Sequence, residues 1–112
     1  MVRRIAGTLF MAGMIFAWVA PSAHAAGDAS AGKDVFLKKC KTCHGEDGHG
    51  NAGMAKLLNT TITPLDSDEV QSKSDADIKT IILEGKAKMK PVKGLTDADI
   101  SNVIAFVRTL KK

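Results

Sequence analysis

Residues 40–44 read Cys40-Lys-Thr-Cys43-His44, and the rest of the chain is best understood from this short stretch. Two thiols three positions apart, with a histidine directly after the second, are the attachment signature of a c-type haem. Positions i and i+3 lie on the same face of a helical turn, so both sulfurs can reach the two vinyl groups of one porphyrin. The motif predicts one covalent haem c attached through Cys40 and Cys43, with His44 as the proximal ligand of the iron.

Other uses of a Cys-x-x-Cys pair fit this sequence less well. A thioredoxin-like redox pair accompanies a strand–helix pattern, and no strand pattern precedes Cys40. A structural zinc site needs about four Cys or His ligands at short spacings, whereas only His44 and His49 accompany the two thiols beyond the leader. A structural disulfide across so short a loop would be strained. Haem attachment accounts for both thiols and for the histidine beside them.

Residues 1–25 have the layout of a signal peptide. Two arginines form a basic start, residues 5–20 are an almost uninterrupted apolar run, and Ala-His-Ala at 23–25 supplies a small-x-small cleavage site. An uncleaved membrane anchor is the alternative, but 16 apolar residues fall short of the roughly 20 that span a bilayer. We therefore expect a cleaved leader and a periplasmic domain at 26–112 that meets the membrane only through that leader. Bacterial c-type haem is attached on that side of the inner membrane, so the leader and the motif agree.

Without the leader, the chain is nearly neutral. It keeps 14 of its 16 basic residues and all 12 acidic ones, a net charge of +2 instead of +4. Nucleic-acid binding is therefore not supported. The remaining residues, about 87, make one domain with a small core, so a haem would supply apolar surface that the sequence lacks.

Helix signals predict an all-α fold with about three main helices and short turns. The first helix should span about residues 29–40, with Asp28 as its N-cap. The second should begin at Ser74, where Ser-Asp-Ala-Asp has the form of a capping box, and should stop at Gly85. No window shows sustained period-two alternation, so no substantial sheet is expected.

The last helix has the clearest pattern. Thr96 should cap it, and apolar residues recur along one face: Ile100, Val103, Ile104, Val107 and Leu110. Weaker patterns indicate single helical turns at 54–58 and 67–71.

A loop rich in small and polar residues follows the haem motif. Its backbone can turn tightly beside a porphyrin because it contains four glycines: Gly45, Gly48, Gly50 and Gly53. His49 also lies here. Because it is so close to His44 in the chain, it could not easily reach the opposite face of the haem, and we interpret it as a solvent-exposed side chain rather than a second ligand.

The second axial ligand is expected from a distant part of the chain. Met89 lies in a lysine-rich loop between two expected helices, where a core methionine is out of place, and Pro91 should stiffen that loop. A thioether is a soft ligand, and a His/Met pair raises the reduction potential of haem. Met54 is the alternative, but its neighbours look like a helix that packs a hydrophobe. A distant loop can fold over the haem face opposite His44, which favours Met89.

Over about residues 27–112 the chain resembles a small bacterial class I cytochrome c with a single haem. The resemblance rests on the haem motif, on Met89 with Pro91 close behind, and on four residues of the first and last helices: Gly32, Phe36, Val103 and Phe106. It implies the all-helical cytochrome c fold, wrapped around one covalent haem, in which those two helices cross, with His44 and Met89 as axial ligands. A small residue such as Gly32 permits the close approach that such a crossing needs.

Three departures from the family pattern affect the site. Many relatives have a proline in the loop after the haem motif, near the carbonyl that accepts from the proximal histidine, where this chain has Gly53. Relatives often hydrogen-bond a haem propionate through Trp or Tyr, and residues 26–112 contain neither, so lysines or main-chain amides must serve. Lys90 also separates Met89 from Pro91, where a direct Met-Pro step is more usual.

With both axial positions filled, the iron would have no open site for a substrate. The expected function is one-electron, outer-sphere transfer between redox proteins by a monomer, without enzymatic activity. Lysines flank the two ligand segments and predict a basic docking rim for acidic partners: Lys39, Lys41, Lys86, Lys88, Lys90 and Lys93. Solvated surface charge is the alternative explanation for these lysines.

Three other kinds of haem protein are alternatives. A five-coordinate gas-binding or sensing protein usually carries its haem motif near the C-terminus of four helices, whereas here the motif lies near the start of the mature chain. A haem peroxidase would need an open distal site or a second haem, and the sequence holds one motif. A small haem subunit of a larger oxidoreductase is compatible with the sequence.

Overall fold

The computed structural model describes Gly7, residues 13–15 and residues 27–112. Nearly all of the expected signal peptide therefore lies outside the described residues. The described chain is helical, with elements α1 (Ala29–Lys39), α2 (Lys41–His44), α3 (Ala52–Leu57), α4 (Asp68–Gln71), α5 (Asp75–Glu84) and α6 (Asp97–Thr109). Within these ranges no helix is long and apolar enough to cross a membrane. The all-α prediction is confirmed, since the described part contains one isolated β-bridge and no strand.

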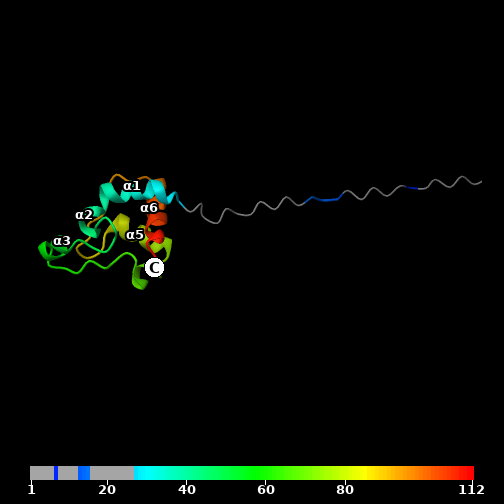
Figure 1. The fold of residues 1–112 in the computed structure, drawn as a ribbon. Coiled ribbons are helices and arrows are strands. Elements are labelled where there is room, and N and C mark those ends of the chain that lie inside the picture. Colours follow the sequence, from blue (N-terminus) through cyan, green and yellow to red (C-terminus); the bar gives the residue numbers. More distant parts are fainter. Residues whose placement is uncertain (1–6, 8–12, 16–26) are drawn as a thin grey trace, which may run out of the picture.

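The first and last helices cross closely, as Figure 1 shows for α1 and α6. Gly32 in α1 lies against the main chain of Asn102 and Val103, so that a Cβ at this position would overlap the Asn102 carbonyl group. One turn further along, the rings of Phe36 and Phe106 meet with centroids 5.1 Å apart at a tilt of 50°. Tilted aromatic pairs of this kind stabilise the fold beyond the contribution of the area that they bury. The glycine and the aromatic pair fix the crossing that the resemblance implied.

The hydrophobic core lies beside this crossing and extends to α5. Its buried members come from three helices: Phe36, Ile78, Ile82, Ile100, Val103, Ile104 and Phe106. The apolar stripe expected on the last helix is buried as far as Val107, and Leu110 packs against the core at its end.

The expected N-caps begin the three longest helices. The Asp28 carboxylate accepts from two main-chain N–H groups of α1, and the Ser74 hydroxyl accepts from the N–H of Asp77. At α6 the capping box is complete, because the Thr96 hydroxyl accepts from Asp99 N and the Asp99 carboxylate accepts from Thr96 N. The reciprocal bond is formed only at α6, so the Ser74 motif gives a single cap rather than a box.

The corner between α4 and α5 is fastened to α6 by Arg108. Its guanidinium donates to the carbonyl oxygens of Gln71 at 3.0 Å and Lys73 at 2.6 Å, and to Asp75 Oδ1 at 2.8 Å. The Gln71 amide nitrogen also donates to the carbonyl oxygen of Val107 at 2.9 Å. A helix as short as α4 is not stable alone, and these bonds hold it in place.

Candidate functional site

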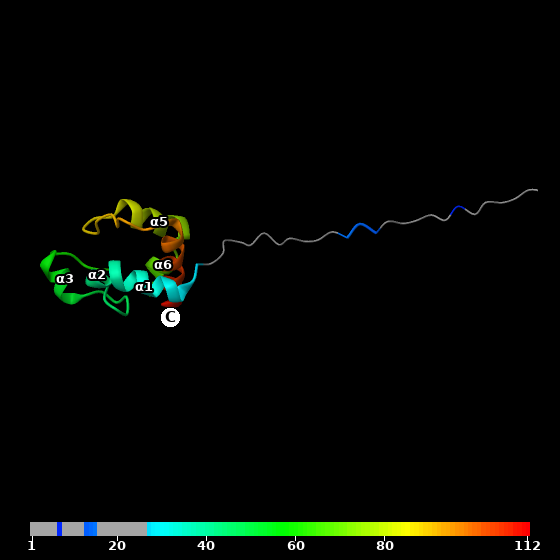
Figure 2. The same ribbon diagram turned by 90° about the horizontal axis from the view of Figure 1, so that it is seen from above.

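A cleft of about 670 Å³ brings together the chemically distinctive residues of the chain. Cys40, Cys43 and His44 line one part of it, and Met89 lines another. Figure 2 shows α2 and α3 on one side of the domain and α5, with the segment that follows it, on the other. Residues nearly fifty positions apart in sequence therefore share a single concave site.

The two cysteines lie at the turn from α1 into α2. Cys40 is both the C-cap of α1 and the N-cap of α2, and Cys43 lies within α2. Both are half-buried free thiols. The turn is held by main-chain bonds from His44 N to Cys40 O at 3.0 Å and from Asn51 N to Cys43 O at 2.8 Å. This backbone places both sulfurs on the cleft, as the helical spacing predicted.

The pKa of the Cys40 thiol differs from that of a redox-active thiol pair. Burial, reinforced by the neighbouring Cys43, raises the pKa of the Cys40 thiol to about 11. Redox-active Cys-x-x-Cys pairs instead have a thiol with a lowered pKa. Burial also lowers the pKa of His44, which favours the neutral imidazole that binds metals.

The ring of His44 has an unsatisfied nitrogen. Its Nδ1 is buried and has no hydrogen-bond partner among the described residues. In relatives a carbonyl near the position of Gly53 accepts from the proximal histidine, and the described chain does not form this bond. Gly53 lies within α3, so it does not form a loop turn beside the haem motif as predicted. The carbonyls of a helix interior point along its axis to other main-chain N–H groups, so they do not turn toward a neighbouring ring.

Met89 is presented by a tight hairpin. Lys86 N donates to Met89 O and Met89 N donates to Lys86 O, each at 2.9 Å. Ala87 adopts a positive φ of 52° at the bend, a conformation that non-glycine residues seldom take. Gly85 precedes the hairpin with φ 78°, and a Cβ there would lie 2.5 Å from the Met89 carbonyl oxygen. The segment that carries Met89 is therefore shaped mainly by its backbone.

Met54 also lines the cleft, from α3. This helix follows α2 closely in the chain and lies beside it in both views, on the side that carries His44. Met54 and Met89 thus enter the same cleft from different elements.

Four of the six rim lysines also line the cleft: Lys39, Lys86, Lys88 and Lys90. Lys41 and Lys93 are exposed but lie outside the lining. The structure adds a segment that no motif indicated, which runs from Leu58 through Lys73 along the cleft. Its residues are ordinary threonines, aliphatic side chains and charges, and no spacing distinguishes them in the sequence.

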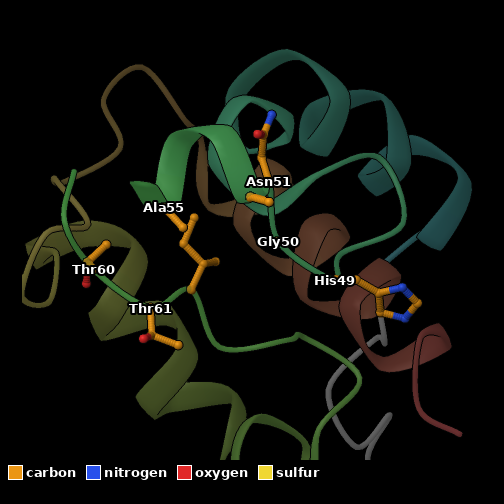
Figure 3. A pocket seen from close by; sticks show the side chains of 8 residues that line it. His49, Gly50, Asn51, Ala55, Thr60 and Thr61 are labelled. Carbon is orange, nitrogen blue, oxygen red and sulfur yellow. The ribbon is translucent and has the colours of Figure 1, made fainter. Parts of the chain in front are cut away.

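His49 is exposed, as expected, and lies outside this cleft. It borders a smaller hollow of about 280 Å³, where Figure 3 shows its ring pointing away from Ala55 and Thr60. Its Nδ1 is 3.0 Å from Asp47 Oδ2 and its Nε2 is 2.8 Å from Asp66 Oδ2. Lys112 Nζ is 3.1 Å from the same Asp66 oxygen. These contacts join the loop after the haem motif to the next loop and to the end of the chain.

Comparison with known proteins matches residues 27–107 to the family described as cytochrome C oxidase, cbb3-type, subunit III. The chain belongs to the c-type cytochromes. The helical fold and the relatives described next together show that the chain is a small class I cytochrome c.

Two curated relatives cover most of the cytochrome. It is 36% identical over 92 residues to cytochrome c-554(547) of Halothiobacillus neapolitanus, an alignment that covers 77% of this chain and 100% of the relative. It is 33% identical over 110 residues to cytochrome c6 of Rippkaea orientalis, which covers 95% and 92% of the two chains. A solved structure, KustC0563 c-type cytochrome, is similar at a TM-score of 0.62 and 33% identity, covering 72% of this chain and 98% of that one.

Haem c is the cofactor of this cytochrome, and the cleft fits it. The volume of about 670 Å³ lies within the range of about 300–1,000 Å³ that cofactor sites occupy. The cleft offers two free thiols and a neutral imidazole, and most of its remaining lining is aliphatic or aromatic. These residues match a flat apolar ring that carries a metal. Because its relatives include cytochromes c-554(547) and c6, the cytochrome is an electron carrier.

Proposed function

We propose that the cytochrome is a periplasmic one-electron carrier whose haem is bonded through Cys40 and Cys43 and ligated by His44 and Met89. The observation that carries the proposal is the single cleft onto which all four side chains converge. When bound, haem c supplies an iron that cycles between Fe(III) and Fe(II). The chain's own residues hold the ring, exclude water from it and determine which edge a partner can approach.

The choice of Met89 rests on the opposed sides of the cleft. A six-coordinate haem needs its two axial ligands on opposite faces. Figure 2 shows the segment after α5, which carries the Met89 hairpin, on the opposite side of the domain from α2. Both Met89 and Met54 line the cleft, but Met54 does so from α3, beside α2. The pair of main-chain bonds in the hairpin would hold the thioether in place without help from neighbouring side chains.

The six rim lysines would form the docking surface. All six are exposed, and none makes an ion pair within residues 27–112. The Lys39 ammonium lies beside Gly94, so the lysines of the haem motif adjoin those of the hairpin segment. A positive rim around a redox centre steers acidic partners by long-range attraction.

Export is the part of the proposal that rests on sequence. The layout of residues 1–25 supports a cleaved leader and a mature domain at 26–112. N-terminal sequencing of the protein from a periplasmic extract tests it, and a chain that retains Met1 would contradict it.

Absorption spectra of the purified cytochrome test the axial ligands. The ferric wild type should show an iron–thioether charge-transfer band, and Met89→Ala should remove it. Met54→Ala is the matched control, because it removes a thioether that lines the same cleft, and it should leave the band in place. A band that survives Met89→Ala would disprove the ligand assignment, and carbon monoxide binding to the reduced wild type would favour a five-coordinate sensor.

The salt dependence of electron transfer tests the docking rim. A variant with Lys86, Lys88 and Lys90 changed to Glu should react more slowly with an acidic redox protein at low salt, and the difference should shrink as ionic strength rises. The control changes Lys33, Lys38 and Lys56, which are exposed and lie outside the cleft lining. Equal rates in both triple variants would mean that the rim lysines are ordinary solvated surface charges and not a docking surface.

A subunit role is the second candidate, because the matched family is described as an oxidase subunit. Gentle extraction and size-exclusion chromatography of the native protein separate the two. Haem absorbance at the size of the single chain supports the free carrier, and absorbance that co-elutes with a large oxidoreductase supports the subunit.

A further inference from the structure

A set of polar side chains lines the haem cleft outside the ligand segments. Apart from residues 39–44 and 86–91, the cleft lining is apolar except for five residues: Thr60, Thr61, Thr63, Glu69 and Lys73. The threonines come from the segment after α3, Glu69 from within α4, and Lys73 from the turn that follows α4. Figure 3 shows two of them, Thr60 and Thr61, side by side on the extended segment that leaves α3.

The polar groups of this cluster lack partners within the described chain. The ammonium of Lys73 is in none of the ion pairs formed by residues 27–112. None of the three threonine hydroxyls takes part in a side-chain hydrogen bond there, although other hydroxyls do. Lys73 is also half-buried, in contrast to the exposed lysines of the rim. The Lys73 side chain therefore lies along the cleft lining and is available to an anion bound there.

The backbone of Lys73 is fixed at the cleft by α6. Arg108 donates to its carbonyl oxygen at 2.6 Å and to that of Gln71 at 3.0 Å. Arg108 is itself oriented by Asp75, whose Oδ1 is 2.8 Å from Nη2. Lys73 therefore begins from an anchored position, which lowers the entropy lost when its side chain binds an anion.

Haem has negative groups in the matching place. Its two propionates lie on the edge of the ring opposite the two vinyl groups, and the cysteines that bond the vinyls lie where α1 meets α2. In Figure 1 the green segment after α3 runs along the other edge of the domain from α1. The propionate edge of a haem attached at Cys40 and Cys43 would thus face the Thr60–Lys73 side.

We propose that Lys73 is the ion-pair partner of a haem propionate and that the Thr60–Thr63 hydroxyls donate to the same edge. This inference rests on the proposed function, because it requires the haem to be attached. Ammonium and hydroxyl groups are suitable donors for carboxylates, and bonds to a charged acceptor are stronger than neutral ones. Glu69 adds a negative charge to the same lining, which increases the need for a cation there. These side chains would take the place of the Trp or Tyr that hydrogen-bonds a propionate in relatives.

The test compares holoprotein variants by redox titration and resonance Raman spectroscopy. Removing a cation beside the haem favours the more positive, oxidised form, so Lys73→Met should lower the midpoint potential and shift the propionate bending band. Lys73→Arg should restore both toward the wild type. Lys33→Met removes an exposed charge on α1 that does not line the cleft, and it should change the potential much less and leave the band unmoved.

The outcomes separate this inference from the proposed function. Lys73→Met and Lys33→Met with equal potentials and unmoved propionate bands would overturn the inference while leaving a haem-loaded carrier. A wild-type chain that carries no covalent haem would overturn the proposed function. If Lys73→Met does not fold, Thr63→Val provides the same readout, and an unmoved propionate band in that variant would count against the cluster.

Discussion

The crossing of α1 with α6 and the haem cleft differ in how completely their side chains are buried by the protein itself. At the crossing, Phe36 and Val103 are only 1% and 2% exposed, and the helix backbones touch at Gly32. Around the cleft, α2 and α3 contain no buried residue, and Met54 and Leu58, which line it, are only half-buried. Protein atoms cover the crossing almost completely, even though Phe36 and Val103 also border the cleft, whereas α3 presents half-exposed apolar groups to a cofactor. The crossing should therefore keep its structure without haem better than the cleft does.

Removing both attachment thiols should reveal the difference between the two regions most clearly. A Cys40→Ala/Cys43→Ala variant should carry no covalent haem, as denaturing mass spectrometry will show. Hydrogen exchange should then accelerate most in α2, α3 and the hairpin at Met89, because these segments lose their main packing partner. Equal acceleration in α1 and α6 would mean that the crossing also depends on the cofactor.

Truncation at the centre of the crossing should have the next largest effect. Phe36→Ala removes a ring that is 1% exposed and paired with Phe106, and such changes cost about 3–5 kcal/mol of unfolding free energy. Urea denaturation of the holoprotein measures it. Leu83→Ala is the control, because Leu83 is 44% exposed on α5 and should cost far less. Similar losses in the two variants would contradict the special role of the crossing.

Adding one methyl group at the helix contact should follow. In Gly32→Ala the new Cβ overlaps the Asn102 carbonyl group, so the helices must separate, at a cost of about 1–3 kcal/mol. Gly53→Ala places the same methyl group in α3, where the nearest atom is Asn51 Oδ1 at 3.3 Å. Because alanine also favours a helix over glycine, this control should be close to neutral in the same denaturation assay.

A charge pair at the end of the chain should give the smallest effect, with a defined pH dependence. The Lys112 ammonium, bonded to Asp66, lowers the pKa of that carboxyl, with His49 adding to the shift. A lowered pKa stabilises the fold above the ordinary Asp value of about 3.9, and this contribution is lost as pH falls through the lowered value. Asp66→Asn should lower the melting temperature at pH 7, and wild type and variant should converge in acid.

Asp34→Asn provides the matched control for that titration. Asp34 is an exposed carboxylate on α1 and forms no ion pair within residues 27–112. Its variant should follow the wild type at every pH. A constant difference between Asp66→Asn and wild type from pH 7 down to pH 2 would show that the carboxylate charge is not responsible.

The sequence predicted those parts of the fold that local chemistry determines. The caps at Asp28, Ser74 and Thr96 begin helices because their oxygens accept from N–H groups two or three positions away. The caps depend on spacing, and spacing is visible in a sequence. The crossing was expected only from the resemblance to class I cytochromes c, which rests in part on four residues of the two helices: Gly32, Phe36, Val103 and Phe106.

The remaining parts depend on tertiary contacts that leave no pattern. Gly53 reads as a loop glycine among its neighbours, but the Asn51 side chain caps α3 and draws it into a helix. The hydrogen bonds of Arg108 to the α4–α5 corner join residues more than thirty positions apart. The placement of Lys73 at the cleft follows from them, and no motif marks it.

The hairpin from Lys86 to Met89 has a consequence for how such a carrier can diversify. Its two hydrogen bonds run between main-chain atoms. They therefore do not depend on which side chains occupy the positions between and beside them. Gly85 and Pro91 set the path of the chain on either side. Mutation can therefore change the charges at 86, 88 and 90 to suit a new partner while the sulfur stays where it is. Under the proposed ligation and docking, selection on recognition and selection on coordination would act on neighbouring residues with little conflict.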